Sequence, residues 1–214
     1  MLMELAREIP LVDCVDLGTV GDSGAEIHGA ITNAIEATAC DIIVTSGGVS
    51  MGELDLIKPY IEHQGQVFFG RLNMKPGKPT TFGRIGNTLI LGLPGNPVSC
   101  FVTASLFFET LVSTIATGSR KDKPSLKAQL LPKSVKVDPI RPEYHRCTIY
   151  RLAHDPNKLI AVSTGANLQQ SSRLLSAANA TGLAFLPAGN QNYECRGQTQ
   201  VVLLEQLQNL PVLS

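Results

Sequence analysis

The first half of the chain alternates between short apolar runs and helical spacing. Ser23 and Glu26 fit a capping box, and apolar residues then recur at positions 27, 31, 34 and 35, which predicts a helix. Residues 41–46 (DIIVTS) and 89–93 (LILGL) are continuous apolar runs, typical of strands buried on both faces of a parallel sheet. The alternation predicts an α/β domain over residues 1–118.

Glycine and proline mark the ends of these elements. The turn PGNP (94–97) leads into a long apolar helix that ends at Gly118, with Asn96 as its N-cap and Pro97 at its first helical position. A glycine-rich turn, GGVSMG (47–52), precedes a shorter helix. Further extended segments of this half are predicted at residues 66–72 and 79–84.

From Lys121 onward the helical spacing disappears. Short apolar runs, separated by proline, glycine and asparagine, are typical of the strands of a small all-β barrel or sandwich. We expect this domain at residues 125–214, joined to the first domain by a linker at 119–124 (SRKDKP). The predicted strands contain the runs SLKAQL, SVKVDP, CTIYRL, LIAVST, LAFLPA and TQVVLL.

The composition narrows the class of protein. The 214 residues are 43% hydrophobic, which is enough for a buried core, and 18 basic residues balance 18 acidic ones. Because non-specific nucleic-acid binding needs a basic excess, we expect no nucleic-acid partner. No run approaches 18 apolar residues, and charged residues interrupt the N-terminus, so we expect neither membrane insertion nor a signal peptide. Five widely spaced cysteines favour free thiols in the cytoplasm.

Three loops carry residues suited to an anionic ligand. TSGGVSMGELD (45–55) and LGLPGNPVS (91–99) each follow a strand and open a helix, so they present backbone N–H groups where ligands of α/β sheets bind. In MKPGKPTTFG (74–83), prolines stiffen a loop that holds Lys75 and Lys78, and an anion between the two ammonium groups would offset their repulsion. Together the loops predict a phosphate-containing ligand.

Each of these features also has a purely structural explanation. Glycine-rich turns are often only tight connections, and loop lysines are often only solvated. Asp22 and Asp55, at predicted helix starts, can serve only to complement the helix dipoles. Three such segments at one sheet edge favour the anion site, but the residues alone do not name the ligand.

The three loops, in this order and at this spacing, resemble the molybdopterin molybdenumtransferase family, which includes MoeA and the gephyrin E-domain. RPEYHRC (141–147) and QQSSRLLSAANATGLAFLP (169–187) extend the resemblance, and FFGRLNMKPGKP with RPEYHRC is particularly similar to animal gephyrin-type proteins. The resemblance implies a parallel-sheet molybdopterin-binding-type domain followed by a small all-β barrel domain. It covers the C-terminal half of a family protein, so we expect the sheet to lack the family's first strand.

The family inserts molybdate into adenylylated molybdopterin and releases AMP, assisted by a divalent cation such as Mg²⁺. The resemblance therefore implies molybdopterin adenylate and molybdate as ligands, and a homodimer. By motif, Asp22 and Asp55 correspond to catalytic and metal-binding acids, and Lys75 and Lys78 to catalytic lysines. The substrate-binding residues implied in the same way are Ser46, Gly47, Gly48, Ser50, Arg71, Pro76, Gly95, Asn96, Ser99, Arg141 and Ser171.

Two other functions stay open on the sequence. The gephyrin E-domain also binds cytoplasmic loops of neurotransmitter receptors, and Tyr144 with the region of Pro187 resembles part of that peptide pocket. A receptor-binding scaffold is therefore the second alternative. A non-catalytic relative is the third, and the presence of both acidic residues and both lysines argues against it. We expect the enzyme, or its ligand-binding half, in preference to either.

Overall fold

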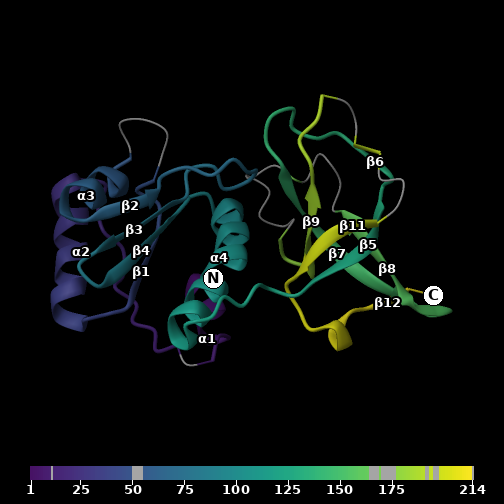
Figure 1. The fold of residues 1–214 in the computed structure, drawn as a ribbon, viewed down its shortest axis with the longest axis horizontal. Helices are drawn as coiled ribbons and strands as arrows, with labels where there is room; N and C mark the ends of the chain where they lie inside the picture. The colour runs from purple at the N-terminus through teal and green to yellow at the C-terminus, as the bar shows by residue number, and fades with distance from the viewer. Residues whose placement is uncertain are drawn as a thin grey trace. The chain divides into compact units, whose positions relative to one another are not determined.

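The structure is a computed structural model, and its described residues form two compact units. The described residues are 1–10, 12–49, 55–163, 169, 177–190, 193–194 and 198–213. The first unit comprises Met1–Leu72 and Gly77–Ala104, and the second comprises Asn73–Pro76 and Ser105–Ser214. Each sheet lies within one unit, with one sheet in the first unit and a six-stranded and a two-stranded sheet in the second, and Figure 1 labels most of their strands.

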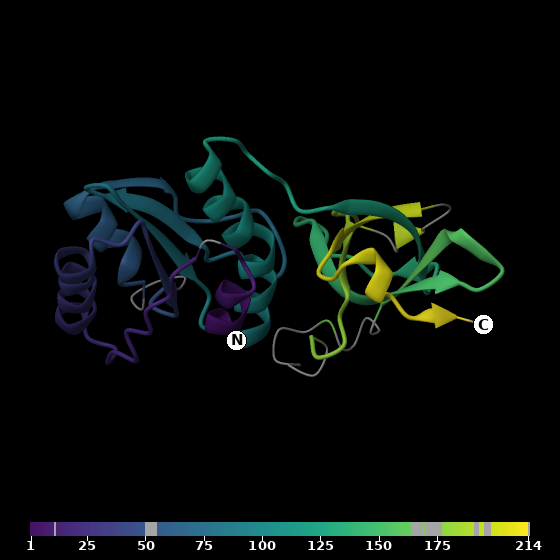
Figure 2. The same ribbon diagram turned by 90° about the horizontal axis from the view of Figure 1, so that it is seen from below.

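The first unit is a layered α/β structure. Its elements are α1 (Leu2–Arg7), α2 (Gly24–Thr38), β1 (Ile42–Ser46), α3 (Ile57–Gln64), β2 (Gln66–Phe69), β3 (Thr81–Ile85), β4 (Thr88–Leu93) and the first turns of α4 (Pro97–Thr117). The strands form one sheet in the order β1-β4-β3-β2. Figures 1 and 2 show α2 and α3 on one face of this sheet and the start of α4 on the other.

The sheet is mixed, which corrects the expectation of a parallel sheet. β1 and β4 are parallel, but β3 pairs antiparallel with β4, and β2 pairs antiparallel with β3. The turn between β3 and β4 is the reason. Ile85 pairs with Thr88, so only Gly86 and Asn87 reverse the chain, and so short a loop joins only antiparallel strands. Gly86 has a φ of 57°, a conformation that favours glycine.

The two apolar strands differ in their burial. β4 has a neighbour on each side and is buried from Ile90 to Leu93, as its sequence predicts. β1 lies at the edge among the described strands, and only Ile43 of its five residues is buried. The prediction that β1 is buried on both faces is therefore wrong, because a continuous apolar run does not tell a central strand from an edge strand.

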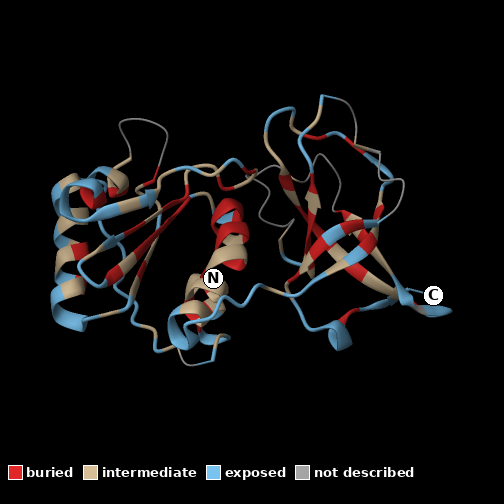
Figure 3. Ribbon diagram, viewed as in Figure 1, coloured by how far each residue is buried: buried red, intermediate tan, exposed pale blue. Residues whose placement is uncertain are grey.

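The core of the first unit lies between the sheet and the helices α2 and α3. Ile31 of α2 and Ile61 of α3 pack in one cluster with Ile43 of β1 and Ile90 of β4. Side chains alternate across a strand, so Leu91, next to Ile90, faces the opposite side of the sheet, where it is also buried. Figure 3 shows buried residues, in red, along the strands of this sheet.

Both ends of α4 agree with the sequence prediction. Asn96 Oδ1 accepts the backbone N–H groups of Val98 at 3.1 Å and Ser99 at 3.3 Å, so Asn96 caps the helix. At the other end Gly118, with a φ of 67°, donates its N–H to the Thr114 carbonyl. The glycine ends the helix because this left-handed conformation is strained for other residues.

Among the described helices, α4 alone is long and apolar enough to cross a membrane. An 18-residue window within it has a mean hydropathy of 1.6, and half of that window is buried inside the structure. Length and composition are weak evidence for a membrane span, because the core helix of a soluble protein has the same properties. The search for a continuous apolar run underestimated the hydropathy of this helix. Its serines and threonines interrupt the run but lower the mean hydropathy only slightly.

The second unit contains a closed barrel, which is one of the two all-β folds that the strand spacing predicts and the one that the family resemblance implies. Its elements are β5 (Ser125–Leu131), β6 (Ser134–Val135), β7 (Glu143–Leu152), β8 (Asp155–Ser163), β9 (Gly182–Leu186), β10 (Tyr193–Glu194), β11 (Gln198–Leu203), η3 (Leu207–Asn209) and β12 (Val212–Leu213). The ring runs β7-β8-β5-β11-β9 and closes where β9 pairs with β7. Residues 119–124 connect α4 to β5 without a helix or strand.

Apolar residues from all five strands of the ring fill the barrel. Leu130, Ile149, Ala161, Leu183 and Val201 have no exposed surface, and they come from β5, β7, β8, β9 and β11 respectively. The inward positions of each strand alternate with more exposed ones, as in β11. The fold is therefore an α/β unit joined to a small all-β barrel, which confirms the predicted fold class.

Candidate functional site

The glycine turns that follow β1 and β4 lie against each other. These two strands are parallel neighbours, and their last residues, Ser46 and Leu93, are paired. The N–H of Gly47 donates to the Leu93 carbonyl at 2.9 Å. A Cβ atom added to Gly95 would lie 3.3 Å from the Gly47 Cα. At Gly47 and Gly95 the two turns therefore approach each other backbone to backbone.

Glycine is required in the first of these turns. Gly47 and Gly48 have φ values of 99° and 69°, which residues with a Cβ rarely adopt. A Cβ on Gly48 would also lie 2.9 Å from Ile57 Cγ1. The Gly48 carbonyl accepts the backbone N–H groups of Leu56 and Ile57, which ties the turn to the start of α3. Ser99, in the first turn of α4, is buried.

The two candidate catalytic acids lie at helix starts of the first unit. Asp22 is exposed and directly precedes Ser23, the N-cap of α2. Asp55 is half-buried, and its Oδ1 accepts the backbone N–H of Lys58 at 3.3 Å. Burial raises the pKa of Asp55 above its usual value, although the Lys58 hydrogen bond and the charges of Lys58 and Arg71 oppose this shift.

These acids do not by themselves make a metal centre. The described part of the chain contains no group of three or more histidine, cysteine, aspartate or glutamate residues that would hold a metal ion. Mg²⁺ is usually held by one or two carboxylates together with substrate phosphates. Asp22 and the half-buried Asp55 would supply carboxylate oxygens, the type of ligand that this cation takes, and a phosphate-bearing substrate would have to supply the others.

Lys75 and Lys78 belong to different units, the second and the first respectively. The sequence predicts that an anion offsets the charge of these lysines, but Lys75 has protein carboxylates as partners. Its Nζ lies 2.6 Å from Glu143 Oε1 and 3.6 Å from Asp138 Oδ2. Lys78 is half-buried and has no ion pair with the described residues. Backbone pairing explains the contact, because Lys75 and Glu143 form an isolated β-bridge.

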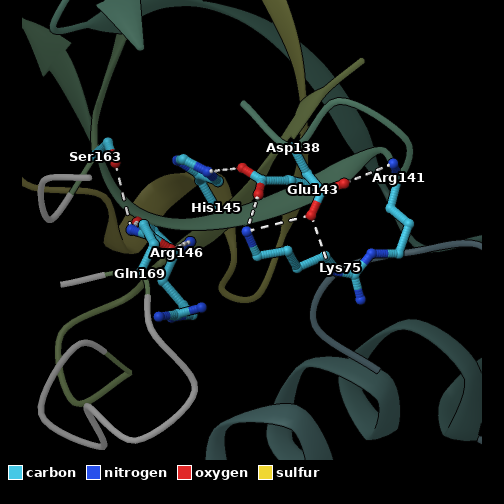
Figure 4. A network of polar contacts seen from close by, with 8 residues as sticks. All are labelled: Lys75, Asp138, Arg141, Glu143, His145, Arg146, Ser163 and Gln169. Atoms are coloured by element: carbon cyan, nitrogen blue, oxygen red, sulfur yellow. Dashed lines mark hydrogen bonds and ion pairs between the residues drawn. The ribbon is translucent and has the colours of Figure 1, made fainter. Parts of the chain in front are cut away.

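Glu143 is the centre of a polar network at the start of β7, drawn in Figure 4. Its Oε2 lies 2.7 Å from His145 Nε2, and Nε2 must donate because an ionised carboxylate only accepts. Residues 143 and 145 share a face of β7 because side chains alternate along a strand. Asp138 Oδ2 accepts from Arg141 Nη2 at 2.8 Å, so Asp138 joins Arg141 to the same network.

The carboxylates of this network are held in their ionised form. Burial alone would raise the pKa of Glu143, but hydrogen bonds from His145 and Lys75 outweigh it, so this pKa lies below its usual value. The hydrogen bond from Arg141 holds the pKa of Asp138 well below its usual range. The network therefore combines cations and ionised carboxylates at neutral pH.

We expect the unfolding free energy to fall as the pH drops from about 4.5, the usual pKa of glutamate, toward the lower pKa values of the folded state. A depressed carboxylate pKa stabilises the fold above the unfolded pKa, and this contribution disappears as protons bind. Chemical denaturation between pH 7 and pH 3 measures the loss. Glu143→Gln should lose less over this range, and parallel losses in both proteins would contradict the assignment.

The structure groups the predicted site residues by unit. Ser46 is the last residue of β1, Gly47, Gly48, Gly95 and Asn96 belong to the turns after β1 and β4, and Ser99 lies in the first turn of α4. Arg71, Asp22, Asp55 and Lys78 belong to the same unit. Lys75, Pro76 and Arg141 belong to the second unit. Ser50 and Ser171 lie outside the described residues.

Sequence reasoning missed Asp138, Glu143 and His145. The sequence RPEYHR does carry a signal for two of them. Glu143 and His145 are two residues apart, directly before the predicted strand run CTIYRL and close to Arg141, a charged residue already singled out. Their contact with Lys75 depends on a pairing between distant segments, which spacing does not reveal.

Both halves of the chain match known families. Residues 1–114 match the family described as "Probable molybdopterin binding domain", and residues 129–202 match the "MoeA C-terminal region (domain IV)". Gephyrin from Dictyostelium discoideum is 40% identical over 191 residues, which cover 79% of this chain and 26% of that protein. Molybdopterin molybdenumtransferase from Bacillus subtilis (strain 168) is 30% identical over 191 residues, covering 89% of this chain and 43% of that protein.

A solved structure shows the same fold. The molybdopterin biosynthesis MoeA protein from Pyrococcus horikosii superimposes with a TM-score of 0.65 at 24% identity, covering 89% of this chain and 43% of that one. The chain thus spans between 26% and 43% of the length of these relatives. Since the first family match covers more than half of the chain, the chain belongs to the molybdopterin-binding domain family, and a MoeA C-terminal region follows that domain.

Proposed function

We propose that the protein acts in molybdenum cofactor biosynthesis as a molybdopterin molybdenumtransferase, inserting molybdate into adenylylated molybdopterin with release of AMP. The observation that carries this proposal is the close backbone approach at the carboxyl ends of β1 and β4. There Gly47 and Gly95 bring two turns into contact within the molybdopterin-binding domain. Backbone N–H groups at helix starts suit the phosphates of such a substrate. Relatives named molybdopterin molybdenumtransferase support the reaction class.

We divide the substrate contacts by their chemistry. The turns after β1 and β4 would bind the phosphate-bearing pterin, and the cations of the second unit would bind molybdate, an oxyanion. Lys78 and Arg71 would add positive charge in the first unit. The residues proposed for the pterin are Ser46, Gly47, Gly48, Ser50, Gly95 and Asn96, and those proposed for molybdate are Lys75, Pro76, Ser99, Arg141 and Ser171.

Asp22 and Asp55 are proposed to hold Mg²⁺ together with substrate phosphate oxygens. The cation would neutralise charge that develops on the phosphoanhydride. Asp55 is suited to this role, because burial already destabilises its ionised form and a cation would relieve that cost. Asp22 is exposed and keeps its carboxylate accessible to a ligand.

We also propose a homodimer in the cytoplasm. Val15, Leu17 and Val20 are exposed apolar residues in a segment without helix or strand, and a second copy would cover them. The described cysteines are free thiols, as expected in a reducing compartment. The receptor-binding alternative is not favoured. Tyr144, its proposed contact, packs its ring edge-on against Phe185 at a centroid distance of 5.5 Å.

An AMP-release assay tests the proposed function. The purified protein is incubated with adenylylated molybdopterin, Mg²⁺ and molybdate, and AMP is measured by chromatography. We expect AMP release that depends on molybdate and stops when a chelator removes the cation. A folded protein that releases no AMP, or releases it equally without molybdate, would refute the proposal.

A further inference from the structure

We infer that Glu143 is a positioning residue for Lys75, fixing its ammonium group at the start of β7 before an oxyanion binds. The inference rests on the proposed function in one respect, namely that Lys75 contacts molybdate. Glu143 is not among the residues that the family resemblance singles out. Its role follows from its contacts within the second unit (Figure 4).

Glu143 is itself held rigidly. Its side chain is only 6% exposed, and its second oxygen is hydrogen-bonded to His145, whose side chain is 4% exposed. At the backbone, Glu143 pairs with Leu186 of β9, so it belongs to the closed ring. Because the Glu143 carboxylate is fixed in this way, its ion pair restricts the position of the flexible Lys75 ammonium group.

The backbone of Lys75 is fixed to the same strand. Its N–H donates to the Pro142 carbonyl, and its carbonyl accepts the N–H of Tyr144, each at 2.9 Å. Both ends of the lysine side chain are therefore restrained, the Cα end by these bonds and the Nζ end by Glu143. Ordering a lysine side chain costs conformational entropy. Here the side chain is already ordered in the absence of ligand, so ligand binding does not have to include this entropy loss.

Lys75 nevertheless stays available to a ligand. Its side chain is 44% exposed. An ammonium group has three donors, and the distance of 3.6 Å to Asp138 is too long for a hydrogen bond. Glu143 therefore takes one donor and leaves others. Asp138 in turn bonds Arg141, so each of the two cations proposed for molybdate is held by its own carboxylate of this network.

Removal of Glu143 would have two opposed effects on anion binding. It would free Lys75 to move, which weakens binding, and it would remove a negative charge, which strengthens binding. Because Glu143 is buried and doubly bonded while Lys75 is exposed, we expect loss of position to dominate. The paired lysine and glutamate of protein kinases follow the same logic, since the lysine must be held in place to contact phosphate.

A double-mutant cycle tests this inference, with molybdate as the probe and isothermal titration calorimetry as the measurement. Glu143→Gln should weaken molybdate binding about tenfold, the upper cost of ordering one long side chain. In a Lys75→Ala background, the same substitution should change the affinity less than about twofold. Glu109→Gln is the matched control, because Glu109 pairs with Lys123 at 2.9 Å in the same unit. It should leave the affinity unchanged.

Each deviation overturns the inference. Unchanged or tighter binding by Glu143→Gln, while Lys75→Ala binds weakly, would mean that Glu143 does not position Lys75. An equal loss in both Lys75 backgrounds would mean that Glu143 acts only through the fold. If Glu143→Gln does not fold, Glu143→Asp takes its place in the cycle. It keeps the charge but shortens the reach, and should show a smaller loss.

A ligand-free measurement separates this inference from the proposed function. If the wild-type protein does not bind molybdate, or Lys75→Ala binds it normally, the proposed role of Lys75 fails. Positioning is then judged by ¹H–¹⁵N NMR of the lysine side chains. Slow proton exchange at the Lys75 ammonium in the wild type, lost in Glu143→Gln, would support it, and identical exchange in both would overturn it.

Discussion

Replacing Asp22 or Asp55 by asparagine is expected to abolish molybdate-dependent AMP release while leaving the protein folded. Removal of a carboxylate from a metal-assisted phosphoryl site should cost several kcal/mol of transition-state stabilisation. Asparagine keeps the side-chain shape and the oxygen that accepts the Lys58 N–H, so it removes only the charge of Asp55. Both variants should therefore lose AMP release but still bind molybdopterin when the two properties are measured on the same preparations.

The structural alternative predicts a different pattern. If the two aspartates only complement helix dipoles, their loss should reduce stability by about 0.3–1 kcal/mol and leave AMP release intact. For Asp55 we expect stability to stay level or rise, because burial already disfavours its ionised form. Asp41→Asn, at an exposed position of the same unit, is the control and should change neither property. Near-normal AMP release from both variants would place the cation elsewhere.

The elements that the sequence predicted well are those whose signals are local. The capping box at Ser23 and the PGNP turn with its Asn96 cap fix α2 and α4 through contacts within a few residues. α1 escaped prediction because six residues are too few to show helical spacing, and only Ala6 among them is buried. The place of β1 at the sheet edge also escaped prediction, since strand order depends on pairing between distant segments.

The candidate site divides in the same way. The glycine turns were predictable because strand, turn and helix follow one another in the sequence. The partner of Lys75 was not, because Glu143 reaches it through an isolated bridge between a loop and β7. Their charges and spacing predict that Lys75 and Lys78 bind one anion between them. In the structure, Lys75 instead forms an ion pair with the buried carboxylate of Glu143. Non-local pairing thus determines which ion pair forms.

Lys75→Ala and Lys78→Ala are each expected to weaken the binding of molybdate or of the pterin adenylate by about 1–3 kcal/mol, the scale of hydrogen bonds to charged groups. Titration calorimetry measures both. Lys78 makes no ion pair with the described residues, and its backbone carbonyl, which accepts the Leu72 N–H, survives the substitution. The effect of Lys78→Ala should therefore appear in binding alone, with the melting temperature unchanged.

Lys75→Ala should differ from Lys78→Ala in its stability. It leaves Glu143, a carboxylate that is 6% exposed, with His145 as its remaining partner, and a buried charge without its counter-ion destabilises a fold. We expect a lower melting temperature, recovered in part when Glu143→Gln removes the uncompensated charge. Lys123→Ala breaks the pair with Glu109, whose side chain is 43% exposed, so it should lower the melting temperature less than Lys75→Ala and leave molybdate binding unchanged. If Lys75→Ala and Lys78→Ala both bind molybdate and the pterin adenylate with unchanged affinity, the two lysines do not bind an anion. They would then have only a structural role or be solvated.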